Sequence, residues 1–103
     1  MRRDVFQAIA DPTRREIIHL VAKGPMTPNA LAEHFDCSRQ AVSKHLKILA
    51  ECALLRQEQA GREIFYKLHI RKLKEVDNWL APYKKMWEGR FDQLDEVLKK
   101  MKK

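Results

Sequence analysis

The sequence predicts a mainly α-helical protein with one small β-hairpin, in the order α-α-α-α-β-β-α, that ends in a long C-terminal helix. Three observations support this fold class. Capping residues and prolines divide the first half of the chain into short helices, two runs of alternating residues near its middle predict paired strands, and apolar residues recur at seven-residue intervals near its end. With 103 residues, 45% hydrophobic and 34% charged, the chain fits one domain over residues 1–103.

A capping signal separates the first two helices. A short helix is expected at about residues 3–10, because three apolar residues share one of its sides: Val5, Phe6 and Ile9. Asp11 is a good N-cap residue, and Pro12 suits the first helical position because it lacks the N–H that would have no partner there. A second helix therefore begins after Asp11 and runs to Lys23.

The next two helices lie close together in the sequence. Thr27 and Pro28 repeat the same signal and open a third helix over residues 28–35. After a tight turn, Ser38 caps a fourth helix, which is expected at about residues 38–52. Two short helices joined by such a turn predict a helix-turn-helix.

A hairpin is expected directly after the fourth helix. Residues 55–59 and 63–69 have the composition of short strands, the second run alternates apolar residues between its two faces, and Gly61 lies in the turn. A hairpin that follows a helix-turn-helix is the arrangement called a winged helix. The wing would span about residues 55–69.

The last predicted helix, at about residues 71–101, carries an apolar stripe. Its members recur every seven residues: Leu73, Leu80, Trp87, Leu94 and Met101. Pro82 lies inside this segment, where it either kinks the helix or divides it in two.

The charge balance indicates the class of partner. The chain has 21 Lys and Arg against 14 Asp and Glu, a formal net charge of +7, which favours a polyanion and makes nucleic acid the first candidate. No apolar run reaches the length of a membrane span, no signal-like stretch follows the first residues, and two cysteines are too few for a disulfide scaffold. We therefore expect a cytoplasmic protein without a membrane span.

The fourth helix carries the pattern that points to a function. On a helical wheel at about 100° per residue, basic and polar side chains fall within one arc: Arg39, Gln40, Ser43, Lys44 and Lys47. The other positions are mostly apolar and would anchor the helix. Arg and Lys suit guanine and phosphate, Gln suits adenine, and Ser allows close approach, which together predict a reader of the DNA major groove. The alternative is a basic face that is only solvated.

Three segments resemble one known family. They are DPTRR at residues 11–15, LAEHFDCSRQAVSKHLKIL at residues 31–49 and GREIFYKL at residues 61–68. Together they resemble the ArsR/SmtB family of bacterial winged-helix repressors over nearly the whole chain, and nearest to its metal-free autorepressors. The resemblance implies a homodimer built from the first and last helices, with the fourth helix, at about residues 38–52, as the recognition helix. It also implies a wing tip near a minor groove or a phosphate. The candidate DNA-binding residues are Ser38, Arg39, Gln40, Ser43, Lys44, Lys47 and Arg62.

One position departs from the family pattern. Members usually have glycine before a leucine at the end of the recognition helix, and this chain has Ala53 before Leu54. If the backbone is left-handed there, alanine costs about 1 kcal/mol relative to glycine. Either the fold absorbs that cost or the helix ends in another way.

The residues that bind metals in many members of the family are missing. Those members use a cysteine-x-cysteine pair in the third helix, or acidic and histidine side chains on the last one. Residues 25–31 here contain no cysteine, and the chain after His69 contains no histidine. His34 and Cys37 are too few ligands for a zinc site, so we expect no metal and no other cofactor. A redox role for Cys37 or Cys52 stays open.

The last helix predicts a partner surface. A continuous helix over this segment would be about 50 Å long, so much of its apolar stripe would extend beyond the rest of the domain. We expect a second copy to cover it; the alternative is a segment that folds back after Pro82 onto its own core. The candidate dimer-interface residues are Val5, Phe6, Ile9, Leu80, Tyr83, Trp87, Phe91, Leu94, Val97 and Leu98.

Together these features predict a homodimeric, sequence-specific DNA-binding regulator, a repressor that occupies a promoter at an inverted-repeat operator. The alternative is a protein-interaction module whose hydrophobic last helix binds a different protein, and a regulatory protein partner stays open as well. An enzyme is not expected, because the sequence has no nucleophile-base pair, no paired carboxylates and no glycine-rich phosphate loop.

Overall fold

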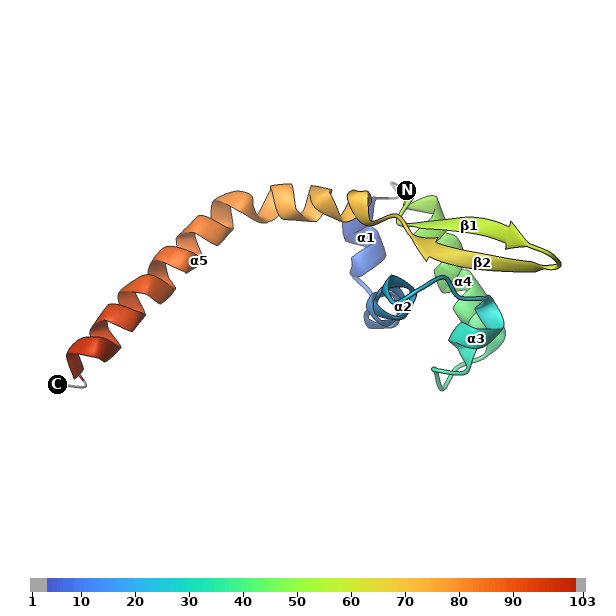
Figure 1. The fold of residues 1–103 in the computed structure, drawn as a ribbon, viewed down its shortest axis with the longest axis horizontal. Helices are drawn as coiled ribbons and strands as arrows, with labels where there is room; N and C mark the ends of the chain where they lie inside the picture. Colours follow the sequence, from blue (N-terminus) through green and yellow to red (C-terminus); the bar gives the residue numbers. More distant parts are fainter. Residues whose placement is uncertain (1–3, 102–103) are drawn as a thin grey trace.

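The computed structural model describes residues 4–101, apart from the side chains of Phe91 and Asp92. Its elements follow the predicted order, which confirms the fold class (Figure 1). They are α1 (Val5–Ile9), α2 (Pro12–Ala22), α3 (Pro28–Ala32), α4 (Arg39–Glu51), β1 (Leu55–Ala60), β2 (Glu63–Leu68), the short 3-10 helix η1 (Ile70–Leu73) and α5 (Lys74–Met101). Arg3, at the start of the predicted first helix, and the side chain of Phe91, from the predicted dimer interface, lie outside the described residues.

Each of the first four helices begins after a polar cap. A side-chain oxygen accepts a backbone N–H three residues ahead at 3.0–3.2 Å: Asp4 from Gln7, Asp11 from Arg14, Thr27 from Ala30 and Ser38 from Ala41. These bonds satisfy donors that have no partner within the helix. The third helix ends at Ala32 and not at Phe35 as predicted. The chain tightens there, because the N–H of Phe35 bonds to the carbonyl three residues back.

The core lies between the first four helices and the base of the hairpin. Its buried members are Val5, Ala8, Ile17, Ile18, Val21, Leu31, Val42, Leu46, Leu49, Cys52, Leu54, Leu55 and Tyr66. Their burial holds α4 by one side only, which leaves its other side to solvent. Val5 has no exposed surface and packs inside its own chain, so it is not available to a second copy, contrary to its predicted place in the dimer interface.

The hairpin is attached to the helices at two places. β1 and β2 pair antiparallel from Leu55 opposite Leu68 to a two-residue turn, where Gly61 has the left-handed φ of +65° that favours glycine. Just before α3, Met26 exchanges two backbone hydrogen bonds with Tyr66, at 3.0 and 2.8 Å. The wing is thereby tied to the helix-turn-helix as well as to the end of α4.

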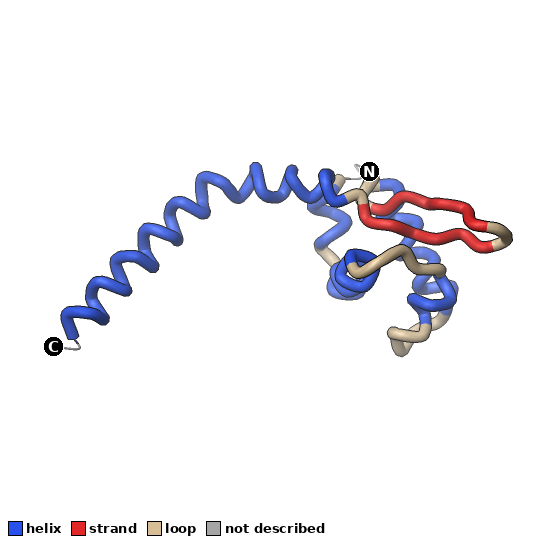
Figure 2. The backbone as a smooth tube through the Cα atoms, viewed as in Figure 1, coloured by secondary structure: helices blue, strands red, loops and turns tan. Residues whose placement is uncertain are grey.

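The long helix α5 continues through Pro82 to Met101. Its ribbon bends part-way along its length (Figure 1), so of the two outcomes left open for Pro82 the structure shows a bend and not a division. The hairpin and α5 extend from the helical core in opposite directions (Figure 2), and the molecule measures 65 × 28 × 24 Å. The alternative in which this segment folds back onto its own core is therefore wrong. Over residues 4–101, none of the helices combines the length and the apolar character that crossing a membrane requires.

Candidate nucleic-acid interface

The fourth helix turns its polar arc to solvent, as the helical wheel predicts. All the predicted DNA-reading side chains of this helix and its cap are exposed: Ser38, Arg39, Gln40, Ser43, Lys44 and Lys47. The opposite side is buried through Val42, Leu46 and Leu49. Because the buried side holds the helix, the whole arc is accessible to a ligand that runs along it.

Both ends of α4 have the local features of a capped helix. Ser38 caps the start of the helix, where its hydroxyl oxygen accepts the N–H of Ala41 at 3.1 Å. At the other end, Ala53 has a φ of +62°, a left-handed conformation that glycine adopts without strain. The helix therefore ends in the expected way, and the alanine carries the backbone strain that a glycine would avoid.

A groove of about 380 Å³ lies between α4, the start of α3 and the wing. Arg39 and Ser43 line it from α4, and Arg62 lines it from the wing turn. Its other walls are Thr27, Pro28, Asn29, Glu63, Ile64 and Tyr66. Three of the predicted DNA-binding residues, from two separate elements, thus share one groove. Lys47 lines a different hollow, between the end of α4 and β1.

The charge on α4 has one sign over most of its length. Arg39, Lys44 and Lys47 are cationic, and the single carboxylate of this helix, Glu51, is its last residue. The N-terminus of the helix adds a partial positive charge beside Arg39. An exposed face of this charge, next to a groove that Arg62 also lines, favours a polyanion such as the DNA backbone.

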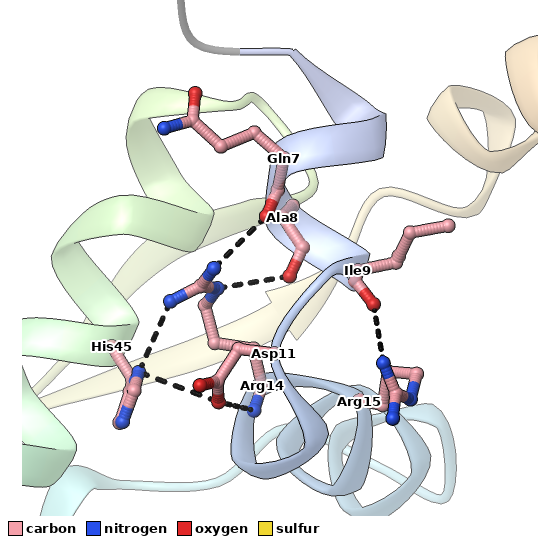
Figure 3. A network of polar contacts seen from close by, with 7 residues as sticks. All are labelled: Gln7, Ala8, Ile9, Asp11, Arg14, Arg15 and His45. Atoms are coloured by element: carbon pink, nitrogen blue, oxygen red, sulfur yellow. Dashed lines mark hydrogen bonds and ion pairs between the residues drawn. The ribbon is translucent and has the colours of Figure 1, made fainter.

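Behind the arc, Arg14 connects three helices (Figure 3). Its guanidinium donates to the carbonyl oxygens of Gln7 and Ala8 at the end of α1, both at 2.9 Å. The same group lies 3.4 Å from Nδ1 of His45 in α4. A carboxylate oxygen of Asp11 lies 3.9 Å from that nitrogen. Sequence reasoning missed this network, because no periodicity relates residues so far apart in the chain.

The carboxylate in this network is held in its ionised form. The hydrogen bond from the backbone N–H of Arg14 lowers the pKa of Asp11, and partial burial opposes that effect. The positive charge of Arg14 lowers the pKa further. Asp11 therefore caps α2 as a carboxylate at neutral pH.

The comparison with known proteins agrees with this geometry. A family described as a helix-turn-helix domain matches residues 9–58. The transcriptional repressor SdpR of Bacillus subtilis (strain 168) is 40% identical over 80 residues, which are 78% of this chain and 89% of SdpR. An ArsR-like transcriptional regulator from Rhodococcus sp. RHA1 has a similar structure, with a TM-score of 0.69 and 31% identity over 90% of this chain and 88% of that one. The chain belongs to the ArsR/SmtB family of winged-helix transcriptional regulators.

A further relative is the HTH-type transcriptional regulator Rv2034 of Mycobacterium tuberculosis, which is 43% identical over 63 residues, 61% of this chain and 59% of Rv2034. The ArsR/SmtB members that match are regulators and repressors of transcription, a class without enzymatic activity. This chain is accordingly a DNA-binding regulator of transcription and not an enzyme.

In this ArsR/SmtB regulator, three aromatic rings join α1 to α5. The ring centroids of Phe6 and Trp79 lie 5.7 Å apart in an edge-on arrangement, and those of Trp79 and Tyr83 lie 5.3 Å apart. All three rings remain partly open to solvent, and Trp79 is 57% exposed. The cluster therefore fixes the direction in which α5 leaves the core and also presents an apolar surface.

The other predicted interface residues lie on α1 and along α5. Ile9 and Leu80 are half-buried, and the remaining ones on α5 are exposed: Trp87, Leu94, Val97 and Leu98. Figure 1 shows the C-terminal half of α5 well away from the helical core. An apolar stripe of this length is the kind of surface that a partner helix covers.

The cysteines lie at opposite ends of the recognition helix of this ArsR/SmtB chain. Cys37 is exposed in the turn before α4, and Cys52 is buried at its end. Within the part of the chain that the structure describes, no three His, Cys, Asp or Glu side chains gather closely enough to hold a metal ion.

Proposed function

We propose that this protein is a homodimeric, sequence-specific repressor that occupies an inverted-repeat operator and so blocks the promoter that contains it. One observation carries the proposal. The exposed arc of α4 and the wing turn border the same groove, which Arg39, Ser43 and Arg62 line together. A duplex laid along α4 would therefore meet both elements at once.

The residues of the arc have different proposed roles. Arg39 and Gln40 lie in the first turn of α4, the part of a recognition helix that reaches base edges, and their side chains suit guanine and adenine. Ser38 and Ser43 permit a close approach of the backbone. Lys44 and Lys47, the remaining cations of α4, neutralise phosphates, and Arg62 contacts a flanking minor groove or phosphate.

The proposed dimer uses the apolar stripe of α5 together with α1. A two-fold dimer of winged helices presents two recognition helices about 34 Å apart, which matches half-sites one DNA turn apart. The exposed rings of Phe6, Tyr83 and Trp87 supply the apolar area that such a contact needs, with Ile9, Leu80, Leu94, Val97 and Leu98 continuing it. Val5 is not part of this surface, because it is buried within its own chain.

We further propose that the repressor acts without a metal ion, in the cytoplasm where its DNA target lies. The third helix has no cysteine, and the last helix has no histidine. The regulatory signal would then act through the concentration of the repressor or through a protein partner.

The proposal is tested by selecting duplexes from a random pool with the full-length protein and titrating the best binder against salt. If α4 and the wing neutralise phosphates, log K falls linearly with log salt by about 0.9 for each phosphate contacted. Replacing Lys44 and Lys47 with alanine should make this slope shallower. The matched control replaces Lys85 and Lys99 with alanine on the polar side of α5, and it should leave the slope unchanged. Binding that is weak and independent of salt would contradict the proposal.

A further inference from the structure

Arg14 and Arg15 are adjacent in α2, and both bind carbonyl oxygens at the end of α1, but their other contacts differ. At the end of that short helix, Arg14 binds the carbonyl oxygens of Gln7 and Ala8, and Arg15 binds that of Ile9 at 2.8 Å. Only Arg14 extends past α1 to the recognition helix, where it lies against His45. Figure 3 shows the guanidinium of Arg14 between the end of α1 and the imidazole of His45, whereas that of Arg15 lies on the other side of the view, below Ile9.

His45 meets Arg14 from the flank of α4 that does not carry the arc. At about 100° per residue, its side chain lies about 100° from Lys44 and about 200° from Lys47. A contact on this flank cannot touch DNA that lies along the arc. Such a contact can change the orientation of α4 and therefore the direction in which its exposed arc faces.

The chemistry of Arg14 decides which tautomer of His45 fits this contact. A guanidinium has only donors, so a hydrogen bond between Arg14 and Nδ1 of His45 requires that nitrogen to be an acceptor. The contact therefore fits the tautomer that carries its proton on Nε2. A carboxylate oxygen of Asp11 lies 3.9 Å from the same Nδ1, farther away than the guanidinium.

We propose that the contact between Arg14 and His45 is a positioning link that sets the angle of α4 relative to α1, and so the half-site spacing that a dimer recognises. The inference rests on the proposed dimeric repressor. It follows from the order of the contacts: α5 is joined to α1 through Phe6 and Trp79, α1 to Arg14 through its terminal carbonyls, and Arg14 to α4 through His45. His45 is thus a positioning residue that makes no contact with DNA.

The test measures binding as a function of operator spacing. Full-length variants are titrated against operators whose half-sites are moved by one or two base pairs, and against a duplex with a single half-site. Each added base pair shifts a half-site by about 3.4 Å and about 34°, so the wild type should lose about tenfold in affinity per step. His45→Ala should flatten this profile to about threefold per step or less, while its affinity for the single half-site stays within about twofold of the wild type.

Two further variants separate positioning from folding. Arg15→Ala loses a cap of α1 but no contact with α4, and it should keep the spacing profile of the wild type. His45→Asn restores an acceptor near the place of Nδ1 and should recover most of the profile. The tautomer gives an independent readout, because side-chain nitrogen NMR in alkaline buffer should show Nδ1 without a proton.

The outcomes distinguish this inference from the function on which it rests. If folded, dimeric His45→Ala keeps the steep profile, or if it loses as much affinity for one half-site as for two, the positioning role is overturned. A proton on Nδ1 in alkaline buffer would overturn it as well. If the wild type itself shows no preferred spacing, the dimeric repressor is contradicted first and this inference with it.

Discussion

The backbone N–H of Leu54 donates to the carbonyl oxygen of Leu49 at 3.1 Å, across the end of the recognition helix. Together with the bond from Ala53 to Ala50, at 3.0 Å, it forms a Schellman motif, and both leucines are completely buried. The motif needs a left-handed residue at position 53, and the chain supplies an alanine with a φ of +62°.

Ala53→Gly should therefore stabilise the protein. Glycine removes the left-handed strain of about 1–2 kcal/mol but adds freedom to the unfolded chain, for a net gain of about 0.5–1 kcal/mol. Urea unfolding of the full chain measures it. Ala50→Gly is the matched control: it lies within α4 and should destabilise the protein by about 1 kcal/mol. A loss of stability in Ala53→Gly would show that the motif does not depend on the conformation of this residue.

Gly61→Ala should weaken the wing through its backbone alone. A Cβ at this position would meet no atom within 4 Å, but the φ of +65° costs an alanine about 1–2 kcal/mol. We expect a lower melting temperature and weaker binding to the selected operator. Gly61→Asn should lose less of both, because asparagine adopts the left-handed region more readily. Equal values for glycine and alanine would mean that the turn relaxes to another form.

Asp11→Asn should remove an acid-sensitive part of the stability. The pKa of Asp11 is lowered in the folded state, chiefly by the N–H of Arg14, so its contribution is complete above the ordinary value of 3.8 and is lost as the pH falls through the lower, folded-state pKa. Asparagine keeps a capping oxygen without the charge. At neutral pH the variant should be less stable by about 1 kcal/mol or less. Urea midpoints measured from pH 6 downward should converge below pH 3.8, and a constant gap would contradict this account.

Gln40→Ala and Lys47→Ala should have different effects on DNA binding. Both side chains are exposed on α4, but an amide reads a base edge whereas an ammonium binds phosphate. Gln40→Ala should reduce the discrimination between bases at one operator position by about 1–3 kcal/mol. Lys47→Ala should weaken binding to all DNA sequences by the same factor. Binding to a panel of single-base operator variants measures both. An equal loss across the whole panel for Gln40→Ala would argue against base reading.

Trp87→Asp should yield monomers that bind the operator poorly. The indole is 40% exposed in the middle of the apolar stripe, and a carboxylate there would be buried without a partner in a dimer. Sedimentation gives the oligomeric state, and operator titration gives the loss of affinity. Lys85→Asp, on the polar side of the same helix, should remain dimeric. A dimeric Trp87→Asp would place the contact elsewhere.

The features that could be predicted from the sequence are local ones. A cap acts within three residues, so Asp11, Thr27 and Ser38 could be placed from their neighbours alone, and each accepts the expected kind of backbone bond. The exposed arc of α4 follows from helical periodicity, which needs no knowledge of the rest of the fold.

The features that could not be predicted join distant parts of the chain. The backbone bonds between Met26 and Tyr66 and the approach of Arg14 to His45 leave no periodic signal, because tertiary packing determines them. The burial of Val5 is a similar case. Its spacing in α1 places it on an apolar side, but only the packing of α1 within the fold decides that this side faces its own chain.

Because α5 is long and bends near Pro82, a small rotation at this point displaces the C-terminal end of the helix by a much larger distance. Residues 83–101 span about 28 Å at the helical rise, so a change of about 10° at the proline swings the tip by about 5 Å. An ion pair between Lys84 and Asp77 connects the residues before and after Pro82 on one side of the helix. A small change of angle at Pro82 would thus give a large displacement at the far end of the molecule, while α4 and its exposed arc keep their packing.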